Sequence, residues 1–186
     1  MKSIPELDAH IAKHIQGGFG PADMAVMKEE CEKLKPGDVY VEIGVDEGRS
    51  ARVAHEYCSE GVYKIFIDIH DPTHTPNLNR AEFMEQEGMV GLGKKGFYVH
   101  GDADEFRDCI DIMQEDYEKK PFIKLLFIDG HHDYDSIKKN TLQWEALVDG
   151  IILFHDYDHP DTKRWLNEHY RDNKEVLHNK IVRVRK

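Results

Sequence analysis

One stretch of the chain, residues 39–50, restricts the fold more than any other. An apolar run ends in an acid, two glycines follow at positions 44 and 48, and a helix-compatible segment comes after them. This order predicts a buried strand, a tight turn and a helix. Gly44 would let the chain turn sharply, and Gly48 would let a ligand approach the backbone. The helix would present free N–H groups to a carboxylate or phosphate, although an ordinary strand-to-helix turn uses glycine in the same way.

The rest of the chain repeats this alternation of apolar runs and helical segments. Strands are expected at 39–43, 63–69, 97–100, 123–128 and 151–154. Helices are expected at 4–16, 21–34, 50–59, 78–87, 104–117, 134–148 and 162–170. A terminal hairpin at 175–177 and 181–185 would bring the sheet to seven strands. The alternation predicts an α/β fold with a doubly wound, mostly parallel sheet and a C-terminal antiparallel hairpin.

Length and charge narrow the class of protein further. We treat residues 1–186 as one domain, with N-terminal helices in 1–36 and the α/β core in 37–186. Acids outnumber bases 36 to 25, and the formal charge of −11 argues against a nucleic-acid or anionic-membrane partner. We expect a cytoplasmic protein, because the chain lacks a membrane-spanning run and a signal-peptide core. Its three cysteines lack metal-type spacing and are expected to be reduced thiols: Cys31, Cys58 and Cys109.

Acids and histidines gather where the expected parallel strands end. All five ends carry an acid, and four also carry histidine: Glu42-Ile43-Gly44, Asp68-Ile69-His70, His100-Gly101-Asp102, Asp129-Gly130-His131-His132 and His155-Asp156-Tyr157. Ligands of doubly wound sheets bind beyond the carboxyl ends of the strands. Loops are wet, so polar residues at one or two ends would be unremarkable, but their presence at all five indicates a binding site.

Two of these acids have the positions expected for nucleoside recognition. Asp68, at the end of the second strand, could accept both ribose hydroxyls, or it could simply form a turn. Asp102 could accept the exocyclic amine of adenine while Ala103 supplies a backbone N–H. Asp102 could equally cap the following helix, and the two roles are compatible.

Two further acids predict a metal site. Asp129 and Asp156 end adjacent strands, and hard divalent cations prefer several carboxylate oxygens. His155 directly precedes Asp156, and His132 lies three positions after Asp129. A histidine near its ordinary pKa is suited to act as a general base, although each of these could be a solvated loop residue.

The glycine stretch, read as Glu42-x-Gly44-x-x-x-Gly48-x-Ser50, resembles motif I of the class I S-adenosylmethionine-dependent methyltransferases. Residues 127–134, 137–139, Trp144 and 150–157 resemble the small-methyltransferase family that includes macrocin O-methyltransferase-like and cephalosporin-hydroxylase-like proteins. The resemblance implies a Rossmann-like fold that binds S-adenosylmethionine through the glycine loop. Expected cofactor contacts are Glu42, Gly44, Gly48, Ser50, Asp68, Asp102, Ala103 and Asp129.

The same resemblance implies a divalent metal, usually magnesium, with manganese also suitable. Its expected ligands are Asp129 and Asp156, with His155 at the next ligand position. Because His155 stands where the family more often has an acid, a borderline metal is favoured over magnesium. His132 corresponds to a general base in some members of the family.

We therefore expect a methyltransferase that transfers the methyl group of S-adenosylmethionine to a hydroxyl of a small acceptor, with Asp129 and His132 as catalytic residues. A homo-oligomer is compatible with the sequence. One alternative is a non-haem metal-dependent oxygenase, with Asp129, His132 and His155 as a two-histidine, one-carboxylate iron site. Another is a non-catalytic module that binds S-adenosylmethionine without turnover.

Overall fold

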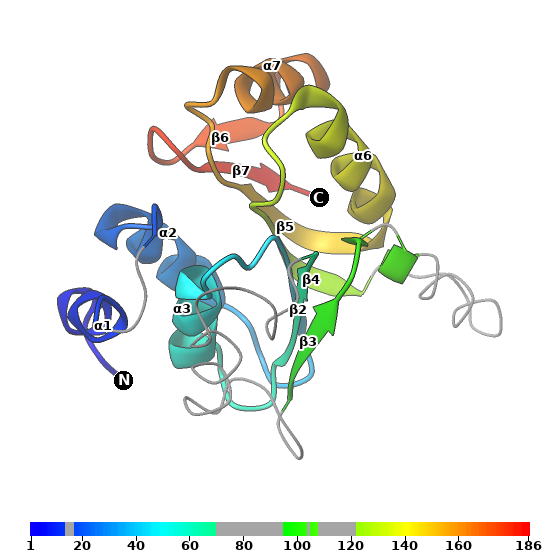
Figure 1. Cartoon of the computed structure of the whole chain (residues 1–186). Coiled ribbons are helices and arrows are strands. Elements are labelled where there is room, and N and C mark those ends of the chain that lie inside the picture. The colour runs from blue at the N-terminus through cyan, green and yellow to red at the C-terminus, as the bar shows by residue number, and fades with distance from the viewer. Residues whose placement is uncertain (14–16, 70–94, 104, 108–121) are drawn as a thin grey trace, which may run out of the picture.

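The computed structural model describes residues 1–13, 17–69, 95–103, 105–107 and 122–186 (Figure 1). The strands are β1 (Val39–Ile43), β2 (Tyr63–Asp68), β3 (Gly96–His100), β4 (Ile123–Ile128), β5 (Val148–Phe154), β6 (Lys174–Val176) and β7 (Val182–Arg185). The helices are α1 (Ile4–Ile11), α2 (Pro21–Cys31), α3 (Arg49–Tyr57), α6 (Tyr134–Trp144) and α7 (Pro160–His169), with a short 3₁₀ turn, η1 (Glu145–Leu147).

The strands form one sheet in the order β3-β2-β1-β4-β5-β7-β6. Strands β1 to β5 are mutually parallel, whereas β7 pairs antiparallel with both β5 and β6. The predicted seven-stranded, mostly parallel sheet with a C-terminal antiparallel hairpin is therefore confirmed. Of the expected helices, the one at 78–87 lies outside the described residues, and of the one at 104–117 only residues 105–107 are described, as helix.

Strand β5 is longer than the sequence predicted. It begins at Val148 rather than at residue 151, and α6 ends at Trp144 instead of residue 148. Gly150, which directly precedes the expected strand at 151–154, lies within β5. A Cβ atom at Gly150 would lie 2.1 Å from the carbonyl oxygen of Lys124. Glycine therefore allows strands β4 and β5 to approach closely beside the irregularity in β4.

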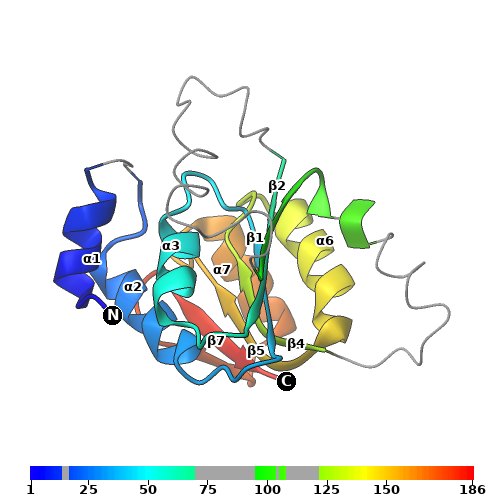
Figure 2. The same ribbon diagram turned by 90° about the horizontal axis from the view of Figure 1, so that it is seen from below.

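Helices cover both faces of the sheet, and Figure 2 shows α1 and α3 on the opposite side from α6. Alternate residues of the central strands face opposite layers. One set packs with α1, α2 and α3: Tyr40, Phe66, Leu125, Phe127 and Leu153. The other set packs with α6 and α7: Val41, Ile43, Leu126, Ile128, Ile152 and Phe154. Burial on both faces explains why these strands read as continuous apolar runs.

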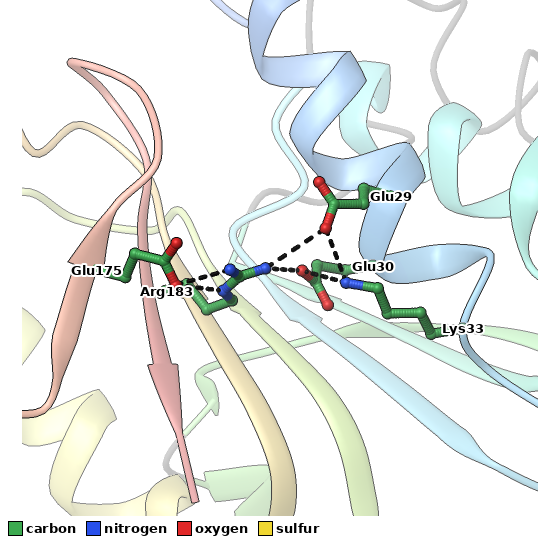
Figure 3. A network of polar contacts seen from close by, with 5 residues as sticks. All are labelled: Glu29, Glu30, Lys33, Glu175 and Arg183. Carbon is green, nitrogen blue, oxygen red and sulfur yellow. Dashed lines mark hydrogen bonds and ion pairs between the residues drawn. The ribbon is translucent and has the colours of Figure 1, made fainter.

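An ion network with a buried centre, Arg183 and Glu30, joins α2 to the antiparallel end of the sheet (Figure 3). The Arg183 guanidinium on β7 contacts Glu30 and Glu29 of α2 and also Glu175 of β6. Lys33 adds a second cation to Glu30, at 2.9 Å. The N-terminal helices are thus held to the core by charge as well as by apolar packing.

The fold bears on two features considered in the sequence, membrane-spanning segments and the state of the cysteines. Among the described residues, no helix combines the length and the apolar character needed to cross a membrane. Cys31 and Cys58 are buried free thiols, as expected, and Cys109 lies outside the described residues.

Candidate functional site

A cavity of about 530 Å³ opens at the carboxyl ends of the parallel strands. All five strand ends contribute to its wall, as the strand-end pattern predicted: Ile43 and Gly44, Asp68, Gly101 and Asp102, Asp129, and His155 and Asp156. These ends are joined by backbone hydrogen bonds from Gly44 N–H to the Ile67 carbonyl and from Asp129 N–H to the Ile43 carbonyl. The wall is therefore a continuous, rigid edge of the sheet.

The glycine turn after β1 has the sharp geometry that its sequence predicted. Gly44 has a φ of +84°, and a Cβ atom there would lie 2.3 Å from the carbonyl oxygen of Asp129. Gly48 has a φ of +82° and caps α3, with no side-chain cap on the helix N-terminus. Gly48 is not among the cavity-lining residues that the structure describes, but Ser50 in the first turn of α3 is one of them. Gly44 therefore allows close packing between two loops, and Gly48 sets the start of the helix.

Glu42 lies beneath the glycine turn and is fully buried. Its carboxyl accepts hydrogen bonds from the hydroxyls of Ser50, at 2.5 Å, and Tyr40, at 2.6 Å. Burial raises the pKa of Glu42 to about 8, against the two hydrogen bonds that lower it. Glu42 is not among the described residues that line the cavity, so its contact there is indirect, through Ser50.

Asp68 is buried in the cavity wall and braces the glycine turn. Its Oδ2 atom accepts the backbone N–H groups of Val45, at 2.8 Å, and Asp46, at 2.7 Å. Asp102 is exposed in the wall and its carbonyl accepts the N–H of Phe106, so it begins a helical turn, while Ala103 lines the cavity beside it. His70, from the same strand-end pattern, lies outside the described residues.

An acid–histidine group occupies the end of the cavity beyond β4 and β5. Nδ1 of His155 lies 3.0 Å from Oδ1 of Asp129 and 3.2 Å from Oδ1 of Asp156. Nε2 of His132 lies 2.8 Å from Oδ2 of Asp156. One ligand atom each from Asp129, His132 and Asp156 falls within 4.8 Å of the others, a spacing that could hold a cation.

The set of Asp129, His132 and Asp156 differs in one member from the metal site predicted from sequence, which has His155 in place of His132. Burial by itself would lower the pKa of His155, but the surrounding carboxylates of Asp129, Asp156 and Asp23 raise it to about 11. The Nδ1 atom of His155 is directed at the carboxylates of Asp129 and Asp156, so a charged ring offsets part of their negative charge.

The pKa values of the Asp129 and Asp156 carboxyls are shifted in opposite directions. Burial raises the pKa of Asp129, against the hydrogen bond from His155 that lowers it. The hydrogen bond from His155 lowers the pKa of Asp156. Asp156 also has a φ of +51°, a backbone conformation that is uncommon for residues other than glycine and that often marks a functional position.

Residues from the N-terminal segment complete the cavity, and the sequence analysis did not predict them. Gly17, Gly18 and Phe19 line it, although their glycine-rich sequence indicated only a break between helices. Arg49 of α3 holds this segment, donating from Nε to the Phe19 carbonyl at 2.9 Å and pairing with Asp8 at 2.6 Å. Lining residues from α6 were also missed: Ser136, Lys139 and Asn140.

Comparison with known proteins assigns the family. A family model described as a methyltransferase domain matches residues 41–157. No curated protein matches the chain. Among solved structures, the MycE methyltransferase of the mycinamycin biosynthetic pathway, in complex with Mg and SAH, has a TM-score of 0.63 at 14% identity, covering 99% of this chain and 55% of that one. This chain therefore spans about half the length of MycE.

Two bacterial structures match over most of their own length. An O-methyltransferase from Bacillus cereus in complex with SAH has a TM-score of 0.64 at 14% identity, covering 98% of this chain and 89% of that one. A methyltransferase from Geobacter sulfurreducens has a TM-score of 0.64 at 13% identity, covering 100% and 89%. The predicted methyltransferase fold is thus confirmed by the strand order and by its structural neighbours. Because the family model covers more than half of its length, the chain belongs to the methyltransferase domain family.

Proposed function

We propose that the protein is an S-adenosylmethionine-dependent O-methyltransferase that acts on a hydroxyl group of a small acceptor with the help of a divalent cation. One observation supports this most directly. A single cavity joins the glycine turn after β1, the acids after β2 and β3, and the acid–histidine group after β4 and β5. A methyl donor and a deprotonating group would therefore share one enclosed space, which is the requirement for direct transfer.

The described residues fit the methyl donor in three parts. The N-terminus of α3, which has no side-chain cap, is suited to the methionine carboxylate. Asp68 is suited to the ribose, and Asp102 with the Ala103 backbone to the adenine. The cavity volume of about 530 Å³ lies within the usual range for small-ligand sites, about 300–1,000 Å³.

The acid–histidine group fits a divalent cation. Asp129 and Asp156 would supply hard carboxylate oxygens, and two such groups at close range repel each other unless positive charge lies between them. His155 already supplies part of that charge from the buried side, and a cation would add to it from the cavity. When bound, such an ion would lower the pKa of the acceptor hydroxyl.

The protein's own residues then position the reactants and move one proton. His132 is the proposed base, because its side chain is 38% exposed and its Nε2 atom is directed at Asp156 rather than into the core. The Asp156 carboxylate would orient the ring and stabilise the imidazolium that forms. Phe19 and the glycines before it would exclude water from one side of the cavity.

The first test is cofactor binding by calorimetry, using S-adenosylmethionine and its demethylated product, S-adenosylhomocysteine. Both should bind, and NAD should not. Asp68→Ala should weaken binding by about 1.5–3 kcal/mol, the range for a hydrogen bond to a charged group. Asp149→Ala is the matched control, since this exposed acid pairs with Lys124 away from the cavity and should have no effect.

Failure of the wild type to bind either compound would contradict the proposed function. Tight binding without turnover on any hydroxylated acceptor would instead favour the non-catalytic alternative. Unchanged affinity in Asp68→Ala would remove Asp68 from the ribose site.

The second test separates the two roles open to His132. As the base, it should impose an acidic limb on the pH–rate profile, and His132→Ala should remove that limb and lower turnover by roughly two to four decades. The manganese affinity of the His132→Ala variant, measured by calorimetry, should remain close to that of the wild type. His131→Ala is the control, because His131 lines the same wall outside the acid–histidine group and its removal should leave the limb in place.

Two results would contradict the proposed base. Loss of manganese binding in His132→Ala would make His132 a metal ligand. An unchanged pH profile with full turnover would make it a loop residue.

A further inference from the structure

Asp23, on the N-terminal helix α2, contacts the back of the acid–histidine group. It is buried, although it lies outside the residues that the family model matches. Its Oδ2 atom accepts the N–H of Gly20 at 2.9 Å, which starts the helix, and lies 3.7 Å from Nε2 of His155. Its Oδ1 atom lies 3.4 Å from Nδ1 of His178.

His155 connects this helix to the cavity. One ring nitrogen, Nδ1, is directed at the carboxylates of Asp129 and Asp156, and the other, Nε2, at Asp23. The ring also packs against Phe19 and Phe127, with centroids 5.4 and 6.2 Å away. Polar contacts at its edges and aromatic contacts on its sides leave the His155 ring little freedom to turn.

A capping role alone does not account for the position of Asp23. A helix-capping carboxylate is usually exposed and needs only its backbone partner. Here Nε2 of His155 and Oδ1 of Asp23 are both buried, and neither has a hydrogen-bond partner among the described residues. Burying such groups is costly unless opposite charge is near, and Asp23 has the rings of His155 and His178 within 3.7 and 3.4 Å of its two carboxylate oxygens.

We propose that Asp23 is a positioning residue, which fixes the His155 ring from behind and thereby holds the Asp129 and Asp156 carboxylates in their cavity-facing arrangement. This inference rests on the proposed function, in which those carboxylates hold the cation and orient His132. Outer partners of metal-binding side chains typically change metal affinity by about 10–100-fold when removed. The N-terminal helices would then contribute a positioning residue to the site in addition to packing against it.

The direct test observes the His155 ring by ¹⁵N nuclear magnetic resonance in the full chain. In the wild type, the ring should give one set of signals, with ring N–H groups protected from exchange with water. Asp23→Asn should shift the ring nitrogen signals and remove the protection, while the amide oxygen can still accept the Gly20 N–H. Glu30→Gln is the matched control: it alters another buried acid of α2, one that pairs with Arg183, and should leave the His155 signals unchanged.

A second measurement uses manganese affinity and does not depend on turnover. Asp23→Asn should weaken binding by up to about 10–100-fold, the range for removing a direct partner of the metal-binding side chains, which here is His155. If Asp23 acts through His155, then His155→Gln should have a comparable effect, and adding Asp23→Asn to it should change little more. Glu30→Gln should bind manganese as the wild type does.

The outcomes separate this inference from the proposed function. A wild type that fails to bind S-adenosylhomocysteine would overturn the proposed function, whatever the His155 signals show. Averaged His155 signals in the wild type, unchanged signals in Asp23→Asn, or fully additive effects of the two substitutions on manganese affinity would overturn the role of Asp23. The wild-type spectrum decides the matter even if Asp23→Asn does not fold.

Discussion

Glu42 shows how one buried carboxyl makes stability depend on pH. Its pKa in the folded protein is about 8, above the ordinary value of 4.5, so between these values the folded state binds a proton that the unfolded state has lost. Stability must therefore fall as pH rises through this window. One pKa unit corresponds to about 1.4 kcal/mol, and the total loss should amount to a few kcal/mol.

We predict that Glu42→Gln flattens this dependence, because an amide keeps hydrogen bonds to Ser50 and Tyr40 but does not ionise. Urea unfolding of both proteins at pH 5, 7 and 9 measures it. Some slope should remain between about pH 6.5 and 11 in the variant, because the pKa of His155 is raised from 6.5 to about 11, so in this window the folded state holds a proton that the unfolded state has lost. Parallel pH profiles for the two proteins would show that Glu42 does not titrate in this range.

Among single residues, those at strand ends could be predicted from sequence because chain direction alone places them. The carboxyl ends of parallel strands share one edge, which brings Asp68, Asp102, Asp129 and Asp156 around one cavity. Side-chain direction within a loop is not set by spacing, so the sequence did not predict that Asp129, His132 and Asp156 would have ligand atoms within 4.8 Å of one another. The role of Asp23 could not be predicted from sequence, because its partner His155 is separated from it by more than half of the residues of the chain.

At the scale of elements, the helices and strands in the described part of the chain were predicted well, and their ends less well. Strand β5 extends back to Val148 because Gly150 can approach Lys124, a contact between strands that no local pattern reports. The packing of α2 on β7 was likewise not predicted. It depends on Glu30 and Arg183, which look like ordinary charged surface residues in the sequence.

We predict that Arg183→Ala destabilises the protein by about 3–5 kcal/mol, because it leaves Glu30 charged and buried beside Lys33 alone. The double variant Arg183→Met with Glu30→Leu should recover most of that loss, since apolar packing can replace a buried pair. Urea unfolding midpoints give both values. A single variant within about 0.5 kcal/mol of the wild type, as is usual for surface substitutions, would mean that the network in Figure 3 contributes little to stability.

At the scale of the whole molecule, a ligand that binds only the folded state should stabilise all of it. S-adenosylhomocysteine at a hundred times its Kd should add about 2.7 kcal/mol, or roughly 5–10 °C in Tm for a chain of this size. Thermal unfolding with and without the ligand measures this, with NAD as the control. An equal response to NAD would contradict a site specific for the methyl donor.

The contact between the Gly44 turn and the Asp129 loop has a consequence for redesign. The two loops touch backbone to backbone, so Gly44 cannot be replaced by a larger residue without displacing the Asp129 loop. Mutational libraries aimed at new acceptors should therefore leave both loops untouched and vary the α6 side of the cavity, at Ser136, Lys139 and Asn140. These positions lie on α6, which is not part of the backbone contact between Gly44 and Asp129. Substitutions there should therefore change the cavity wall while the two loops keep their positions.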